Sequence, residues 1–483
     1  MKKLLSQLLG ESAIYGISSM ISRFISIFLV PIYTKLLLPD DYGKLSLVNS
    51  TFYFVTALAV FAMDSASARW YYDTEDLNEK KSIFSSWFWF QFFTSLILCI
   101  VIILSSTLFS RIILKEPNQQ LLFIIPAVGL ISSILPTMIS NWLRYQRKAI
   151  HTVIFTICNV LLNIGLNILF VVYLKMNVKG ILYALLISNS IASIYVLIIL
   201  KDWIRFSYFS KQKLEEMLRY AMPLVPTAFA FWILNSSSTF LINYFHNKTE
   251  VGLFQIGSMV ASAVGMVVGA FQMSWGPFAF SIIEKPQSKN VFSFVLTAYS
   301  ALMCTVALGI ALFAKEILIL FTNAKYYDAY IVAGILAFNT IIYGYAYIAV
   351  IGSNIKKDNK PLAISIFLAA IITTIIYFFL VPKFGKEGAA LSTFLGYIIV
   401  PIYLFYRSQK HWYIPFNFGL SIFIFSLAIG TFIFSIHLNE NIISSNIIFK
   451  KLGLYIFYVS LVLSIIILKY PTVKKYLPKY LSR

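Results

Sequence analysis

The feature that most restricts the fold of this chain is a succession of apolar runs, which follow one another from near the N-terminus to residue 468. Each run is long enough for a helix rising about 1.5 Å per residue to cross a hydrocarbon core of about 30 Å. The runs are continuous, whereas the strands of a membrane barrel alternate in polarity over about 10 residues. With 59% hydrophobic and 12% charged residues, no stretch remains for an appreciable soluble domain. We therefore predict an all-α polytopic membrane protein.

The apolar runs predict fourteen transmembrane helices. They cover residues 12–37, 44–63, 83–109, 120–143, 152–174, 178–200, 221–245, 250–274, 291–314, 328–352, 361–381, 387–406, 417–437 and 450–468. An even number of spans places both termini on the same side of the membrane.

The distribution of basic residues predicts which side that is. With the termini in the cytoplasm, the cytoplasmic segments hold 25 Lys and Arg residues and the external segments hold 13. Cytoplasmic loops of membrane proteins are enriched in these residues, so we expect both termini inside. The net charge of +20 is explained in this way, because the basic residues are scattered through short loops and form no stripe that would bind nucleic acid.

Two pairs of glycines indicate an internal repeat. The turn at Gly43 resembles the turn at Gly252, 209 residues later, and the segment at Gly180 resembles the one at Gly388, 208 residues later. Because each copy holds six spans, both copies insert in the same orientation. We expect two pseudo-symmetric six-helix lobes around a central cleft, related by an axis along the membrane normal.

The repeat predicts three parts of the chain. Residues 1–205 form an N-terminal six-helix lobe, residues 206–410 a C-terminal six-helix lobe, and residues 411–483 two extra helices with a basic tail. The connection 201–220 mixes basic and aromatic residues, and we expect it to lie along the membrane surface between the lobes.

Arg23 stands near the middle of the first predicted span, where a charged side chain needs a reason. At 100° per residue it shares one side of the helix with Ser19, Ser26 and Tyr33. One interpretation is a structural ion pair with a carboxylate of another helix. Acidic residues are nearly absent from the spans, so we favour a water-filled cavity in which Arg23 binds an anionic substrate.

Polar residues inside other spans are further candidates for the lining of that cavity. Asn159 and Asn163 belong to a stripe that steps by three or four along the fifth span, Asn235 and Thr239 bound a polar run in the seventh, and Gln272 lies in the eighth. Amides and hydroxyls at these positions either bind substrate or hydrogen-bond neighbouring helices, and the second role is the commoner one.

Residues for enzyme chemistry are poorly supplied. The sequence has no Walker A, GxSxG or HExxH motif and no paired carboxylates within its spans. The three cysteines lie inside apolar runs and the four histidines stand singly, so we expect neither a disulfide framework nor a metal site. The predicted external loops are also too short to house an active site. We therefore predict that the chain is not an enzyme and has no cofactor.

Several segments carry a resemblance to a known family. They are FLVPIYTKLLLPDDYGKLSL (28–47), FAMDSASARWYYD (61–73), YAMPLVPTAFAFWILNSSS (220–238) and KEGAALST (386–393). Together with the arginine in the first span and the fourteen-span plan, they resemble the Wzx-type polysaccharide flippases of the multidrug/oligosaccharidyl-lipid/polysaccharide exporter superfamily. The resemblance extends over essentially the whole chain.

The resemblance implies a function. Such a flippase turns a lipid-linked oligosaccharide, usually on undecaprenyl pyrophosphate, from the cytoplasmic to the external leaflet of the bacterial inner membrane by alternating access, for O-antigen or other surface polysaccharides. Arg23 matches the cavity cation that holds the pyrophosphate. Polysaccharide-assembly proteins and membrane lipids are the implied partners, and coupling to an ion gradient stays open. This chain departs from relatives with an Asp-Arg pair in the seventh span, because it has SSST at 236–239.

Other functions compete with this interpretation. A multidrug exporter of the same superfamily would be expected to have twelve spans and an acidic residue in its first lobe, where this chain has an arginine. A glycan polymerase or glycosyltransferase would be expected to carry a sizeable external loop. A lipid II flippase would differ by being essential regardless of surface glycan.

Overall fold

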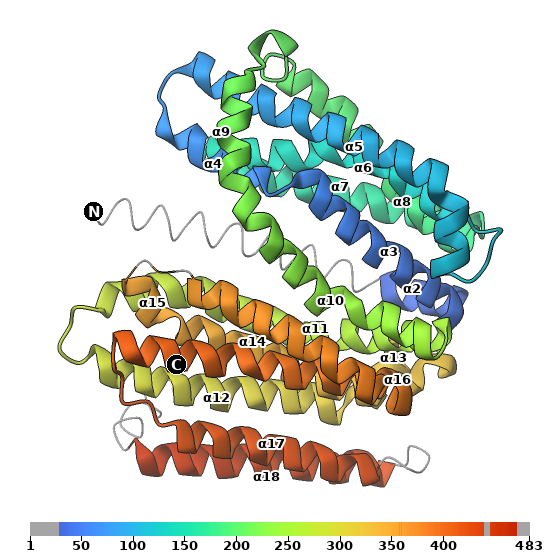
Figure 1. Ribbon diagram of the computed structural model, residues 1–483. Helices are drawn as coiled ribbons and strands as arrows, with labels where there is room; N and C mark the ends of the chain where they lie inside the picture. Colours follow the sequence, from blue (N-terminus) through green and yellow to red (C-terminus); the bar gives the residue numbers. More distant parts are fainter. Residues whose placement is uncertain (1–28, 357, 359, 439–444, 471–483) are drawn as a thin grey trace. The chain divides into compact units, whose positions relative to one another are not determined.

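The computed structural model describes residues 29–356, 358, 360–438 and 445–470. All regular elements among these residues are helices (Figure 1). A helix lies at each predicted span from 44–63 to 450–468, and twelve helices in this part of the chain are long and apolar enough to cross a membrane. The prediction of an all-α polytopic membrane protein is confirmed.

Contacts between residues group the described chain into two compact units. Unit 1 contains the chain up to Gln255 together with 321–325 and 377–385. Its helices are α2 (Leu29–Leu36), α3 (Pro39–Val60), α4 (Met63–Asp73), α5 (Leu77–Ile113), α6 (Leu121–Tyr145), α7 (Ala149–Asn167) with the π-helix η1 (Ile168–Tyr173), α8 (Asn177–Leu200), η2 (Phe206–Tyr208), α9 (Lys211–Ala221), η3 (Met222–Leu224), α10 (Val225–Phe245) and the first part of α11 (Lys248–Ile282). Within it α6 packs against α5 and α8, and α10 packs against α3.

Unit 2 contains the rest of α11 and most of the later helices. They are α12 (Ser288–Leu312), α13 (Ala314–Phe321), η4 (Ala324–Ala329), α14 (Tyr330–Ala349), α15 (Ile351–Ile355), α16 (Lys360–His411), α17 (Phe418–Leu438) and α18 (Ser445–Lys469). Here α12 packs against α14, α17 and α18, and the last two helices lie side by side (Figure 1). The division into lobes at 205 and 206 stays a prediction.

Helix α16 is too long for one span. Its 52 residues would extend about 78 Å as a straight helix, more than twice a hydrocarbon core of about 30 Å. At Gly385 the backbone leaves the helical region, with φ 52° and ψ −127°, a conformation that glycine adopts without a Cβ penalty. The predicted spans 361–381 and 387–406 lie on the two sides of this kink. Most of the first predicted span lies outside the described residues, so the total of fourteen stays a prediction.

The predicted linker contains a short amphipathic helix. Met217 and Ala221 of α9 are fully buried, while Lys211 and Glu215 are exposed. The helix packs against α4 and α5, and Lys213 pairs with Glu79 of α5. Its apolar face is therefore covered by protein, and its position on a membrane surface stays a prediction.

Candidate functional site

The predicted site residues fall into three groups. Arg23, Ser19 and Ser26 lie outside the described residues. Asn159, Asn163, Asn235 and Thr239 belong to unit 1, and Gln272 is an exposed residue in the part of α11 that belongs to unit 2.

A chain of hydrogen bonds joins three helices at the asparagine stripe. The Tyr33 hydroxyl donates to Oδ1 of Asn167 over 2.7 Å, and Nδ2 of Asn167 donates to Oδ1 of Asn163 over 3.0 Å. Nδ2 of Asn163 in turn donates to the Ser188 hydroxyl over 3.2 Å. This chain ties α2, α7 and α8 together, and Asn167 is the last residue of α7 before the π-helix η1. Asn163 and Asn167 therefore act as links between helices here, the commoner of the two roles considered for the stripe.

Asn159 has a different environment on the same helix. Its Oδ1 atom is buried and has no hydrogen-bond partner among the described residues. The side chain lines a cavity of about 390 Å³ between α6, α7 and α8, whose other walls include His151, Phe155 and Tyr195. The cavity is mainly apolar, and Asn159 supplies it with a hydrogen-bond acceptor.

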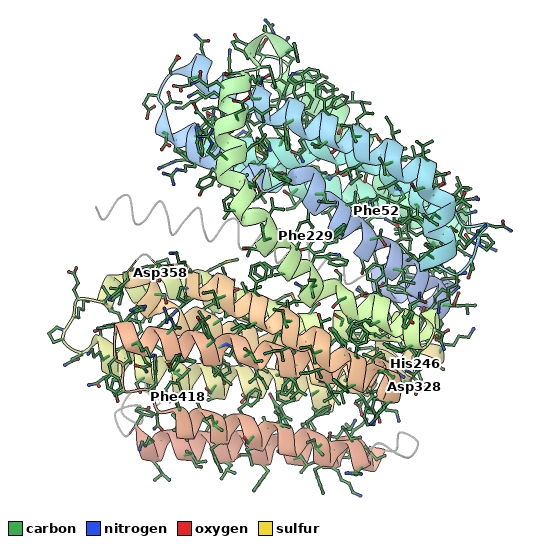
Figure 2. The ribbon with its side chains drawn as sticks, in the orientation of Figure 1. Phe52, Phe229, His246, Asp328, Asp358 and Phe418 are labelled. Carbon is green, nitrogen blue, oxygen red and sulfur yellow. The ribbon has the colours of Figure 1, made fainter. Side chains whose placement is uncertain are left out.

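The polar run of the seventh predicted span does not present one uniform face. Asn235 is exposed, and its Nδ2 atom donates to the Phe231 carbonyl of its own helix over 2.7 Å. Thr239, one turn later, is 3% exposed, and Ser236 is also buried. Helix α10 packs here against α3, on which Figure 2 labels Phe52. The structure thus leaves Asn235 exposed on the surface of α10 and places Thr239 within a packed contact.

The N-termini of α3 and α11 cross in backbone contact. A Cβ atom added at Gly43 would lie 1.9 Å from the Lys248 carbonyl oxygen, and one added at Gly252 would lie 1.9 Å from the Pro39 carbonyl oxygen. The two contacts are equivalent, because an offset of 209 residues converts Pro39 into Lys248 and Gly43 into Gly252. The predicted repeat register therefore relates residues that meet at a local two-fold crossing.

Local sequence explains why both helices begin at this point. Pro39 occupies the first turn of α3, where its missing N–H is not needed, and Asp40 and Asp41 follow in the positively polarised first turn. At α11, Oδ1 of Asn247 accepts from the backbone N–H of Glu250 over 2.9 Å, as a capping residue does.

A charged cluster surrounds the crossing. Glu116, in the loop between α5 and α6, pairs with Lys44 of α3 over 3.0 Å and with Lys248 of α11. Lys44 also pairs with Asp40 over 3.2 Å. Partial burial works to raise the pKa of Glu116, but hydrogen bonds from Lys248 and Lys44 outweigh this effect and lower the pKa below its ordinary value. Sequence reasoning missed Glu116, whose only signal was an acidic residue in a short predicted external loop.

Unit 2 contains a second cavity of about 460 Å³ between α12, α14, α16 and α17. Its walls are almost wholly apolar and include Tyr345, Phe405, Phe425 and Phe418, the last of which is labelled in Figure 2. Such a cavity can take hydrocarbon and offers little to a polar group. Among the described residues no group of three His, Cys, Asp or Glu side chains could hold a metal ion.

Comparison with known sequences identifies the family. Residues 32–326 match the family described as "Polysaccharide biosynthesis protein", which is more than half of the chain. The chain belongs to the polysaccharide biosynthesis protein family. No curated protein matches the sequence significantly.

Solved structures show which fold this member of the polysaccharide biosynthesis protein family has. The lipid II flippase MurJ in its inward closed conformation matches with a TM-score of 0.72 and 16% identity, over 94% of this chain and 98% of that one. An inward-facing multidrug resistance MATE transporter of the MOP superfamily matches with a TM-score of 0.64 and 16% identity, over 80% of this chain and 94% of that one. An outward-facing multidrug resistance MATE transporter of the MOP superfamily matches with a TM-score of 0.60 and 17% identity, over 83% of this chain and 95% of that one.

These findings confirm the predicted family and the all-helical membrane fold, while the fourteen spans and the two lobes stay predictions. The chain is a multi-pass membrane protein with the fold of the MOP superfamily, as the sequence resemblance implied. The family and this transporter fold confirm the prediction that it is not an enzyme.

Proposed function

We propose that the chain is a flippase of a lipid-linked oligosaccharide in the bacterial cytoplasmic membrane. It turns the polar headgroup, of the undecaprenyl pyrophosphate type, from the cytoplasmic to the external leaflet by alternating access of two six-helix lobes. Fourteen spans with both termini in the cytoplasm belong to this proposal, as do the lobes 1–205 and 206–410. The product serves the assembly of a surface polysaccharide.

The observation that carries the proposal is how much of the chain each relative covers. The MATE transporters match 80–84% of this chain with TM-scores of 0.55–0.64. The relative named as a lipid II flippase matches 94% with a TM-score of 0.72. This greater coverage favours a flippase of a lipid-linked cargo over a multidrug exporter, and the family description supplies the polysaccharide.

Arg23 is the residue to which we assign the pyrophosphate. A charge at mid-membrane depth costs about 2.5–3.5 kcal/mol on insertion scales, so its retention calls for a role. Tyr33 shares the predicted helical side of Arg23, and its hydroxyl donates to the buried Asn167 of α7. This contact supports an orientation in which that side of the first span faces polar protein. A guanidinium suits the pyrophosphate because its fixed fork of donors engages two phosphate oxygens at once.

The remaining candidate residues differ in how readily their polar groups can contact the headgroup or the glycan. The exposed Asn235 and Gln272 and the cavity-lining Asn159 offer polar groups to a ligand. Asn163 and Thr239 would have to exchange helix contacts for substrate contacts. Ser19 and Ser26 share the predicted helical side of Arg23 and accompany it in the proposal.

The test of the proposal is a pair of substitutions at Arg23. Arg23→Ala should leave the protein at normal membrane abundance but abolish surface glycan, with the undecaprenyl-linked precursor accumulating inside. Arg23→Lys should restore export only in part, since lysine supplies the charge without the fork. Arg111→Ala, at an exposed position near the end of α5, is the matched control and should export normally.

Two outcomes would contradict this role. Normal export by a normally abundant Arg23→Ala protein would exclude pyrophosphate binding by Arg23. A loss of membrane abundance in Arg23→Ala, without precursor accumulation per molecule of protein, would instead indicate a structural ion pair whose carboxylate has lost its partner.

A further inference from the structure

The charged cluster at the α3–α11 crossing joins three separate segments of the chain. Glu116 connects the loop after α5 to Lys44 and Lys248, and Lys248 also donates to the Leu114 carbonyl over 3.1 Å. The same loop is attached to the end of α10, since Lys115 donates to the Asn243 carbonyl over 2.9 Å. The loop, α3 and the α10–α11 turn are therefore fastened at one place.

The charges of the cluster balance. Two lysines, Lys44 and Lys248, face two carboxylates, Asp40 and Glu116. Both of these lysines are thus engaged by carboxylates of the chain, and neither is held open for an anionic headgroup. The chemistry of the cluster therefore fits a contact that holds chain segments together.

The helix crossing beneath the cluster brings two backbones into direct contact. Gly43 and Gly252 allow the two backbones to touch, and the Ser46 hydroxyl donates to Oε1 of Gln255 over 3.2 Å at positions that are again 209 residues apart. At the two glycines the backbones can separate without a side chain being withdrawn from between them. Water can replace the few hydrogen bonds that are lost.

We propose that this crossing is the external closure of the transport pathway and that Glu116 is its latch. The predicted topology places the N-termini of α3 and α11 at the external face. Alternating access requires the external end to close and open in turn, so α3 and α11 must part here once per cycle. This role rests on the proposed function only in requiring that the chain transports a cargo by alternating access.

Protonation does not release the latch near neutral pH. Because Lys44 and Lys248 lower the pKa of Glu116, the carboxylate stays charged above its ordinary range of about 4.3, and its contribution is lost only as the pH falls through the lowered value. Titration of Glu116 therefore does not open the crossing at neutral pH.

Labelling of a buried cysteine tests the latch directly. Ser46 is 5% exposed at the crossing, and Ser46→Cys in a Cys158→Ser background places a thiol there without the exposed native cysteine. Adding Glu116→Gln should speed its reaction with a membrane-impermeant thiol reagent, applied from outside, by roughly three- to tenfold, the range for losing ion pairs of this exposure. Glu116→Asp, which keeps the charge, should restore slow labelling in part.

The control uses an ion pair elsewhere in the same unit. Glu75 pairs with Lys80 over 3.3 Å with its side chain 99% exposed, so Glu75→Gln should leave the labelling rate unchanged. Equal rates for Glu116→Gln and Glu75→Gln would overturn the latch whatever the cargo is.

A cross-link asks whether the crossing must open during transport. Cysteines at Ser46 and Gln255, whose side chains touch, should form a disulfide under oxidation that blocks glycan export and is reversed by a reductant. Full export by the cross-linked protein would mean that the crossing is a permanent pivot. If Glu116→Gln speeds labelling but Arg23→Ala exports normally, the latch stands and the proposed headgroup site fails.

Discussion

Substituting either of the two crossing glycines by alanine should push α3 and α11 apart and lower the free energy of unfolding by a measurable amount. The added Cβ of Gly43→Ala would lie 1.9 Å from the Lys248 carbonyl oxygen, whereas a carbon and a carbonyl oxygen rest about 3.3 Å apart. The helices must therefore move apart by about 1.4 Å, because the obstructing atom belongs to the backbone and cannot rotate away. Gly252→Ala meets the Pro39 carbonyl oxygen at the same distance and requires the same movement.

Overpacking of a tight contact costs about 1–3 kcal/mol, and we expect each single alanine to destabilise the protein by this amount. The double variant should cost clearly less than the sum, because a displacement that admits one methyl group at a two-fold crossing also makes room for the other. A coupling free energy of about 1 kcal/mol or more between these two substitutions, 209 residues apart in sequence, would indicate such a shared displacement.

Thermal unfolding of the detergent-purified protein measures these differences. Gly269→Ala, on the same helix α11, is the matched control, since its Cβ would meet nothing within 4 Å. It should be neutral or stabilise by about 0.5–1 kcal/mol through helix propensity. Destabilisation by Gly269→Ala equal to that by Gly43→Ala, or strict additivity of the two crossing variants, would refute the steric argument.

Three further predictions concern other parts of the chain. Lys451, fully buried in α18, donates to Oε1 of Glu316 in α13 over 2.5 Å. Lys451→Met should lower the free energy of unfolding by about 3 kcal/mol or more, because it leaves the Glu316 carboxylate unpaired. Adding Glu316→Gln should recover most of this loss in the same thermal assay. A cysteine at the exposed Asn235 should react with a water-soluble thiol reagent faster than one at the buried Thr239, and equal protection would contradict the placement of α10. A reporter fused to the C-terminus should read cytoplasmic, and an external reading would remove the fourteen-span topology.

The helices could be predicted from sequence because their signal is local. A run of apolar residues long enough to cross a membrane is recognisable without knowing its neighbours, and the break between 361–381 and 387–406 was visible in the polar residues around Gly385. The structure adds what those residues do, since Gly385 adopts a positive φ that ends one helical segment and starts the next.

The candidate site could be predicted only in part, since its contacts join residues far apart in the chain. The stripe containing Asn163 was recognisable by its spacing. Its hydrogen bond to α2, however, joins Asn167 to Tyr33, which lies 134 positions earlier in the chain. Asn235 and Thr239 lie one turn apart on the same side of α10, yet one is exposed and the other buried. The difference depends on the helices packed around each level of α10, and no pattern within α10 encodes it.

The crossing of α3 and α11 combines a symmetric contact with an asymmetric one. At a two-fold crossing each copy of the repeat meets the same steric demand, so glycine is needed at both Gly43 and Gly252. The charges follow no such rule: adding 209 to Lys44 leads to Leu253, and adding it to Glu116 leads to Lys325. A second latch of the same kind therefore cannot form at the equivalent positions. Close backbone contact belongs to both halves of the repeat, whereas the ion pairs of Glu116 strengthen it from one side only.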